Sequence, residues 1–115
     1  MKRNDVYLRH ILDELKFLID KSEDLKFDEF MENEILQRAF TRSLEIIGEA
    51  VKNISPDFKE KHDDIEWKKI AGLRDKVIHY YFNVNWEIVW DVIKNKAQDL
   101  NRKIEKIMEV DNFNS

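Results

Sequence analysis

The segment from Arg74 to Tyr81 contains the side chains of this sequence best suited to phosphate chemistry. A guanidinium can bind a phosphate through two hydrogen bonds, and a histidine can transfer protons near neutral pH. Arg74 and His79 could therefore cleave a phosphodiester without a metal ion, which makes a ribonuclease the leading hypothesis. Asp75 lies four residues before His79, so on a helix its carboxylate could contact and orient the imidazole.

A purely structural role for the same segment stays open on the residues alone. A histidine near a helix C-terminus interacts favourably with the helix dipole, and Tyr80, Tyr81 and Phe82 could simply close one end of a core. Arg74 and His79 are five residues apart, so an ideal helix directs them about 140° from each other. They can converge if the arginine side chain wraps, if the helix end distorts, or if a second chain joins them across a two-fold axis.

Composition bounds the classes of protein that need to be considered. The chain has 115 residues, two glycines, one proline and 38% charged residues, which predicts one domain of long helices. It has no cysteine, and no apolar run long enough to span a membrane, so we expect a cytoplasmic protein. The net charge of −4 disfavours non-specific binding to duplexes but allows a local RNA site. Because metal-ligand spacings and glycine-rich phosphate loops are missing, no metal or cofactor is expected.

Apolar residues recur at helical spacing in four stretches, which predicts an all-α, antiparallel up-down four-helix bundle over residues 1–110 with a frayed tail at 111–115. The first stripe runs from Leu8 to Ile19, and the second helix from about Asp28 to Asn53, where Pro56 ends it. Residues 57–64 are expected to form a loop. The remaining helices should span Ile65–Tyr80 and Trp86–Ile107, the latter capped by Asn85. Trp90 lies beside the last stripe and is a candidate exposed anchor at a dimer contact.

The stretch from Ile65 to Phe82 resembles the signature of the HepT-like toxins of the HEPN superfamily, through Arg74, His79, the second tyrosine and the phenylalanine after it. Supporting similarities are Gly48-Glu49-Ala50 and Ser55-Pro56 upstream, and residues 84–90 downstream. The resemblance covers roughly residues 4–108. One departure is Asp75, because close relatives more often carry Asn there, and a carboxylate beside the phosphate site could weaken RNA binding.

The resemblance implies a metal-independent endoribonuclease toxin that acts as a symmetric homodimer. Arg74 and His79 of both subunits would line a cleft and cleave RNA by acid–base chemistry, leaving a 2′,3′-cyclic phosphate, with Asp75 supporting the site. Tyr80, Phe82 and Trp90 are candidates for the dimer interface.

The resemblance also implies a partner, a minimal nucleotidyltransferase antitoxin of the MntA type, in a type II- or type VII-like toxin–antitoxin pair. It would silence the toxin by transferring AMP from ATP to Tyr81. An alternative is a non-catalytic helical subunit that presents a nucleotide or substrate to a nucleotidyltransferase. A third interpretation is a plain dimerising bundle.

Overall fold

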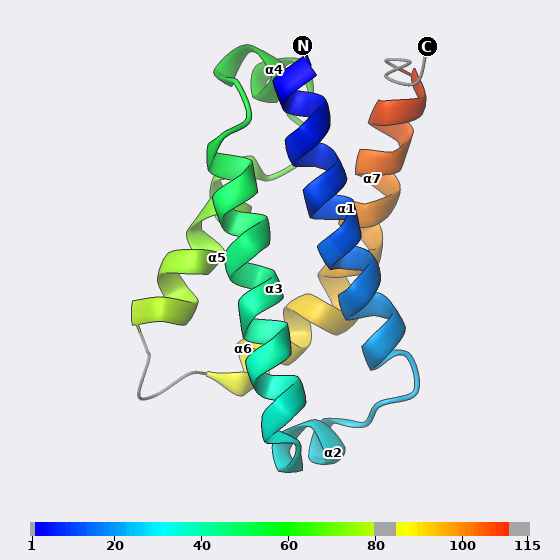
Figure 1. Ribbon diagram of the computed structural model, residues 1–115, viewed down its shortest axis with the longest axis vertical. Helices are drawn as coiled ribbons and strands as arrows, with labels where there is room; N and C mark the ends of the chain where they lie inside the picture. The colour runs from blue at the N-terminus through cyan, green and yellow to red at the C-terminus, as the bar shows by residue number, and fades with distance from the viewer. Residues whose placement is uncertain (1, 80–84, 111–115) are drawn as a thin grey trace.

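The computed structural model describes residues 2–79 and 85–110, without the side chains of residues 2, 3, 74 and 77–79. Its long segments are α1 (Lys2–Ser22), α3 (Glu34–Lys52), α5 (Trp67–His79) and a last helix made of α6 (Trp86–Asp91), the π-helical turn η1 (Val92–Lys96) and α7 (Ala97–Val110). These segments run alternately down and up the molecule (Figure 1). Every regular element in the described ranges is helical, which confirms the predicted all-α bundle. Tyr80, where the third helix was expected to end, and the predicted tail at 111–115 lie outside the described residues.

The core follows from the predicted apolar stripes. Leu8, Ile11, Leu15 and Leu18 of α1 are buried, and α3 buries Phe40, Leu44, Ile47 and Val51 against them. Burying one such side chain stabilises the fold by about 1.5–3 kcal/mol. Helix α3 packs most extensively on α5 and α1, while α1 packs on α7. The order of neighbours is therefore α5, α3, α1, α7, and α5 is held mainly by α3.

The second predicted helix is divided in two by Asn33. This residue has an extended backbone (φ −108°, ψ 91°), and it separates α2 (Phe27–Glu32) from α3. Its side-chain oxygen accepts a hydrogen bond from the backbone N–H of Leu36 at 3.0 Å, so Asn33 is the N-cap of α3. The prediction of one continuous helix was wrong here because the apolar stripe continues across a residue whose side chain starts a new helix.

The predicted loop at 57–64 is also corrected, since most of it is helix α4 (Pro56–Lys61). Ser55 caps this helix by accepting from the N–H of Phe58 at 3.3 Å, and Pro56 suits the first turn because it needs no hydrogen-bonded N–H. Phe58 is buried. His62, which follows this helix, is half-exposed: its ring centroid lies 4.5 Å from that of Phe58, and its carbonyl accepts from the indole N–H of Trp67.

The last helix changes direction at η1, so that α6 is inclined and α7 is nearly parallel to the long axis (Figure 1). Asn85 caps α6 as predicted, accepting from the N–H groups of Glu87 and Ile88. A π-helical turn contains one extra residue per turn and is a recognised cause of helix bending. Lys94 within it donates to the carbonyl of Ser22 at 2.6 Å, which fixes the turn to the end of α1.

An aromatic cluster holds α6 against α2. The Phe30 ring is fully buried and stacks on Phe40 and Trp90, with centroid distances of 5.6 and 5.3 Å, while Trp86 meets it edge-on at 5.8 Å. Such ring pairs add to the free energy gained from burial alone. The cluster therefore fixes the start of the last helix at the end of the bundle opposite α4.

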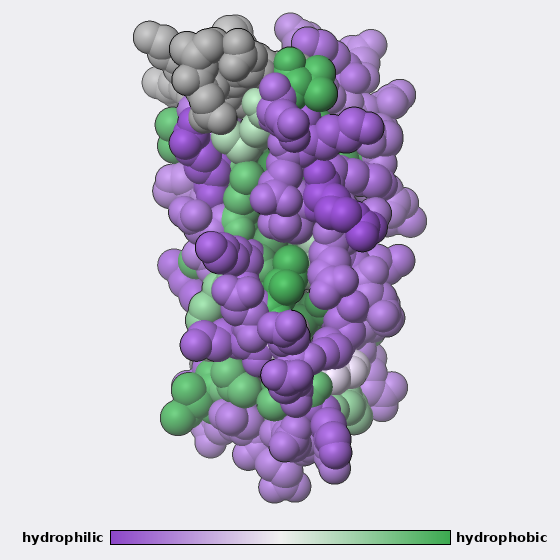
Figure 2. Space-filling model, turned by 90° about the vertical axis from the view of Figure 1, so that its right-hand side faces the viewer, coloured by the Kyte–Doolittle hydropathy of each residue, from purple (hydrophilic) through white to green (hydrophobic). Residues whose placement is uncertain are grey.

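Figure 2 shows hydrophilic side chains over most of one face, with a narrow hydrophobic strip running along the long axis. None of the helices within the described ranges is long and apolar enough to cross a membrane.

Candidate functional site

Helix α5 carries the predicted catalytic segment and is anchored at its beginning. Trp67 is 6% exposed and its indole donates to the carbonyl of His62 at 2.9 Å. Ile70 and Leu73 are half-buried against the core, whereas Asp75 and Lys76 are exposed. The chain from Arg74 to His79 is one uninterrupted helix, as predicted. The start of the helix is thus fixed in the core, while Asp75 and Lys76 of the predicted catalytic segment face solvent.

Several predicted site residues lie where side chains are not described. These are the proposed catalytic pair Arg74 and His79 and the residues that follow, Tyr80, Tyr81 and Phe82. The expected contact of Asp75 with His79 falls on the same part of the chain. Their roles therefore stay predictions, and the described geometry concerns the surface beside them.

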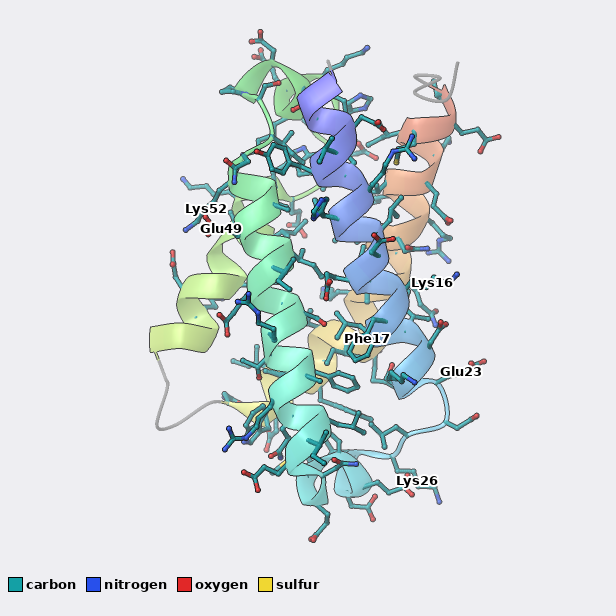
Figure 3. All side chains as sticks on the ribbon, viewed as in Figure 1. Lys16, Phe17, Glu23, Lys26, Glu49 and Lys52 are labelled. Carbon is teal, nitrogen blue, oxygen red and sulfur yellow. The ribbon has the colours of Figure 1, made fainter. Side chains whose placement is uncertain are left out.

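Asp75 forms an ion pair that sequence reasoning missed. Its Oδ1 atom lies 3.7 Å from Nζ of Lys52, which projects from the last turn of α3. In Figure 3, Lys52 and Glu49 lie on the side of α3 that faces α5. No local pattern marks Lys52, because its position beside the motif depends on how α3 packs on α5. The ion pair could have been predicted only by someone who already knew that α3 packs on α5.

A groove of about 380 Å³ lies between α5 and the last helix. Its walls include core residues such as Leu15 and Leu44, so its floor is apolar. Four lysines contribute to its lining, two from α5 and two from the facing helix: Lys69, Lys76, Lys96 and Lys103. Two carboxylates, Glu66 and Asp99, also line it, so lysines outnumber carboxylates by two among the described lining residues. The groove runs along the helix that carries the motif.

Two of these four lysines are paired with carboxylates. Lys69 lies 2.9 Å from Glu66, and its hydrogen bond and charge hold the pKa of Glu66 below the ordinary value. Hydrogen bonds from Lys103 and Arg102 likewise lower the pKa of Asp99. Lys76 and Lys96 make no ion pair with another described residue. The charge of Lys96 does help to lower the pKa of Glu66. Lys76 and Lys96 are thus the groove lysines that have no carboxylate of the described residues within ion-pair distance.

A second, shallower hollow of about 300 Å³ lies between α1 and α3, and His10 lines it. Its other polar lining residues include Arg42, Glu45 and Glu49, so it collects charges of both signs. Arg42 and Glu45 are 3.7 Å apart. Its two glutamates outnumber its one arginine, so it suits a polyanion less well than the groove, where lysines outnumber carboxylates. Among the described residues, no three His, Asp or Glu side chains are grouped closely enough to bind a metal ion.

Trp90 packs within its own chain more than the sequence suggested. Its ring stacks on Phe30 and meets Phe27 edge-on at 5.7 Å, and Nζ of Lys94 lies 5.2 Å from its centroid. The side chain is half-buried rather than exposed. Its proposed role at a dimer contact stays a prediction.

Comparison with known proteins gives matches along almost the whole chain. The family described as "Ribonuclease HepT-like" matches residues 11–107. A protein named as a candidate RNase in Caldanaerobacter subterraneus subsp. tengcongensis is 48% identical over 109 residues, covering 95% of this chain and 97% of the relative. Another candidate RNase, from Methanocaldococcus jannaschii, is 46% identical and covers 95% and 92% of the two chains.

A further relative, from Thermococcus cleftensis, is named as a probable ribonuclease HepT. It is 39% identical to this chain, and the match covers 93% of this chain and 98% of the relative. No solved structure matches the chain.

Proposed function

Because this chain belongs to the ribonuclease HepT-like family, we propose that it is a metal-independent endoribonuclease whose reaction is carried out by Arg74 and His79. The observation that carries the proposal is that helix α5 holds both residues in one continuous helix while its neighbouring positions Asp75 and Lys76 are exposed. A site on such a helix is open to a long polymer, and the lysines of the neighbouring groove suit a polyanion.

In the proposed reaction, the RNA 2′-hydroxyl attacks the adjacent phosphorus and the bond to the 5′-oxygen breaks. One imidazole removes the 2′-hydroxyl proton, and a protonated imidazole gives a proton to the departing 5′-oxygen. The products are a 2′,3′-cyclic phosphate and a 5′-hydroxyl. Acid–base assistance of this kind contributes about 10²–10⁴ in rate. Arg74 would stabilise the charge that develops on the phosphate oxygens. A two-fold dimer would supply two histidines to one cleft.

The test is cleavage of total RNA in EDTA by the purified wild type and by His79→Ala. We expect the wild type to produce cyclic phosphate ends and the variant to lose at least about 10² in rate. Both proteins should have the same circular dichroism and melting temperature. An inert wild type that is properly folded would reject the ribonuclease. It would favour a binding subunit of a nucleotidyltransferase, in which Arg74 and His79 only hold phosphates.

We also propose that the activity is regulated as in a toxin–antitoxin pair, by an MntA-type nucleotidyltransferase that transfers AMP to Tyr81. The support is the family and the position of Tyr81, seven residues after Arg74 and therefore on the same side of a helix that would continue to it. An AMP group there would add bulk and negative charge against a polyanionic substrate. Tyr81→Phe should cleave RNA and resist silencing by the transferase with ATP. If this variant is still silenced, Tyr81 is not the modified residue.

A further inference from the structure

The ion pair between Lys52 and Asp75 differs from most others in the described part of the molecule. Pairs such as Arg38–Glu34 and Lys69–Glu66 join residues three or four apart along the chain. Lys52 and Asp75 instead connect α3 to α5, with 3.7 Å between Nζ and Oδ1. Asp75 directly follows Arg74 in the sequence. The pair therefore involves the residue that directly follows the proposed phosphate-binding residue in the sequence.

Stability does not account for this pair. The two side chains are 39% and 59% exposed, and their separation is near the limit for an ion pair. Exposed pairs of this kind contribute little to the free energy of unfolding. Their charges matter more for a ligand that approaches the same surface. A carboxylate that follows Arg74 and has no cation near it would weaken the attraction of this part of the helix for a phosphate, whereas a nearby ammonium offsets its negative charge.

We propose that Lys52 is the residue that compensates the charge of Asp75, so that the motif helix binds RNA despite having a carboxylate after its arginine. This inference rests on the proposed ribonuclease function and adds a residue of α3 to that site. Lys52 acts by offsetting the charge of Asp75. It does not touch the reacting atoms. The inference also explains how this chain can carry Asp75 without losing affinity for its substrate.

A double-mutant cycle tests the proposal with the wild type, Lys52→Ala, Asp75→Asn and the double variant. Loss of one compensating charge at this range should raise KM for RNA about three- to ten-fold while kcat changes little. Asp75→Asn removes the charge that Lys52 balances. The double variant should therefore return to about the KM of the wild type, and the increase caused by Lys52→Ala should be largest at low salt.

The matched control is Lys16→Ala, which removes the same charge from the exposed surface of α1, on the other side of the molecule in Figure 3. Its KM should equal that of the wild type. Lys52→Ala should melt within about 2 °C of the wild type, because exposed pairs stabilise little.

Three results would overturn the inference while leaving the ribonuclease in place. These are an unchanged KM in Lys52→Ala, an equal increase in Lys16→Ala, and an increase that Asp75→Asn does not reverse. The last result would make Lys52 a direct phosphate ligand instead of a partner of Asp75.

Binding of a labelled single-stranded RNA to the same four variants in a His79→Ala background separates the two proposals. If the wild type does not cleave but the cycle still shows rescue in binding, the ribonuclease fails and the charge compensation stands. If the wild type cleaves but Asp75→Asn does not rescue RNA binding by Lys52→Ala, only the charge compensation fails. RNA that is neither bound nor cleaved rejects both.

Discussion

Asn4 is a buried polar residue that joins the first helix to the loop before α4. Its amide donates to Oγ of Ser55 at 3.1 Å, and its Oδ1 accepts from the N–H of Ser55 at 3.0 Å. Only 2% of the residue is exposed. Buried polar atoms are costly when they lose their partner. Asn4 lies within α1, which begins at Lys2, and its partner is 51 positions away in the sequence.

Asn4→Ala should lower the free energy of unfolding by about 1–3 kcal/mol, because it removes two hydrogen bonds and leaves the Ser55 N–H without its acceptor. Urea denaturation followed by circular dichroism measures the change. Asn95→Ala is the control, since Asn95 is exposed and its amide bonds only to Asp91 on the same helix. Equal losses in the two variants would mean that the Asn4–Ser55 link has no special importance.

Local signals identified some residues of the site region and could not identify others. The cap at Asn85 and the helix through Arg74 and His79 were predictable, because each depends on spacing within a few residues. Lys52 and Asn4 were not, because their partners Asp75 and Ser55 are brought close only by packing of α3 on α5 and of α1 beside α4. The charge next to the motif is thus a tertiary property that no local pattern records.

At the scale of elements, the short helix α2 matters because it supplies Phe30 to the aromatic cluster. Phe30→Ala should cost about 3–5 kcal/mol of unfolding free energy through the cavity that it leaves. Tryptophan fluorescence should shift in the native state as well, because Trp86 and Trp90 both contact this ring. Phe27→Ala, at a half-buried position on the same helix, should have a clearly smaller effect on both. A larger loss from Phe27→Ala would contradict this assignment of the core.

The long helices were predictable because each carries an apolar stripe over several turns, and the short ones were not. Helix α4 is mostly charged, and it forms because Ser55 and Pro56 start it and Phe58 is buried under it. The break between α2 and α3 at Asn33 was missed because the apolar spacing continues across it. The bend at η1 was also missed, because the apolar spacing of the last helix is regular through it. The short helix, the break and the bend depend on N-cap residues and on packing against neighbouring helices. The spacing of apolar residues does not indicate either.

At the scale of the whole molecule, the charge is unevenly distributed. The chain has a net charge of −4, yet lysines line both walls of the groove between α5 and the last helix. The end of α2 and the start of α3 form a separate surface. It exposes apolar and acidic residues, including Ile35 and Glu32. An acidic protein can thus offer RNA one basic strip while repelling it elsewhere, which favours one orientation of binding.

The proposed cleft needs two chains, so the active species should have about twice the 14.0 kDa mass of one chain. Size-exclusion chromatography with light scattering, followed by RNA cleavage assays of each fraction, checks this expectation. Cleavage that follows the dimer across a dilution series supports a cleft shared by two subunits. Full activity in fractions of single-chain mass would show that one Arg74–His79 pair is sufficient.

The π-helical turn has a consequence for which changes of length the chain can tolerate. Because α6 packs on α2 while α7 packs on α1, one continuous helix serves two neighbours that lie in different directions. Removing a single residue from Val92–Lys96 would convert the wide turn into an ordinary one, and the helix after it would keep nearly its present rotation. Ile104 and Ile107 would then still face the core. Removing a residue from the regular helix between Ala97 and Ile104 would instead rotate both side chains by about 100° and take them out of the core. The wide turn is therefore the place where the last helix can lose one residue without displacing the core residues that follow it.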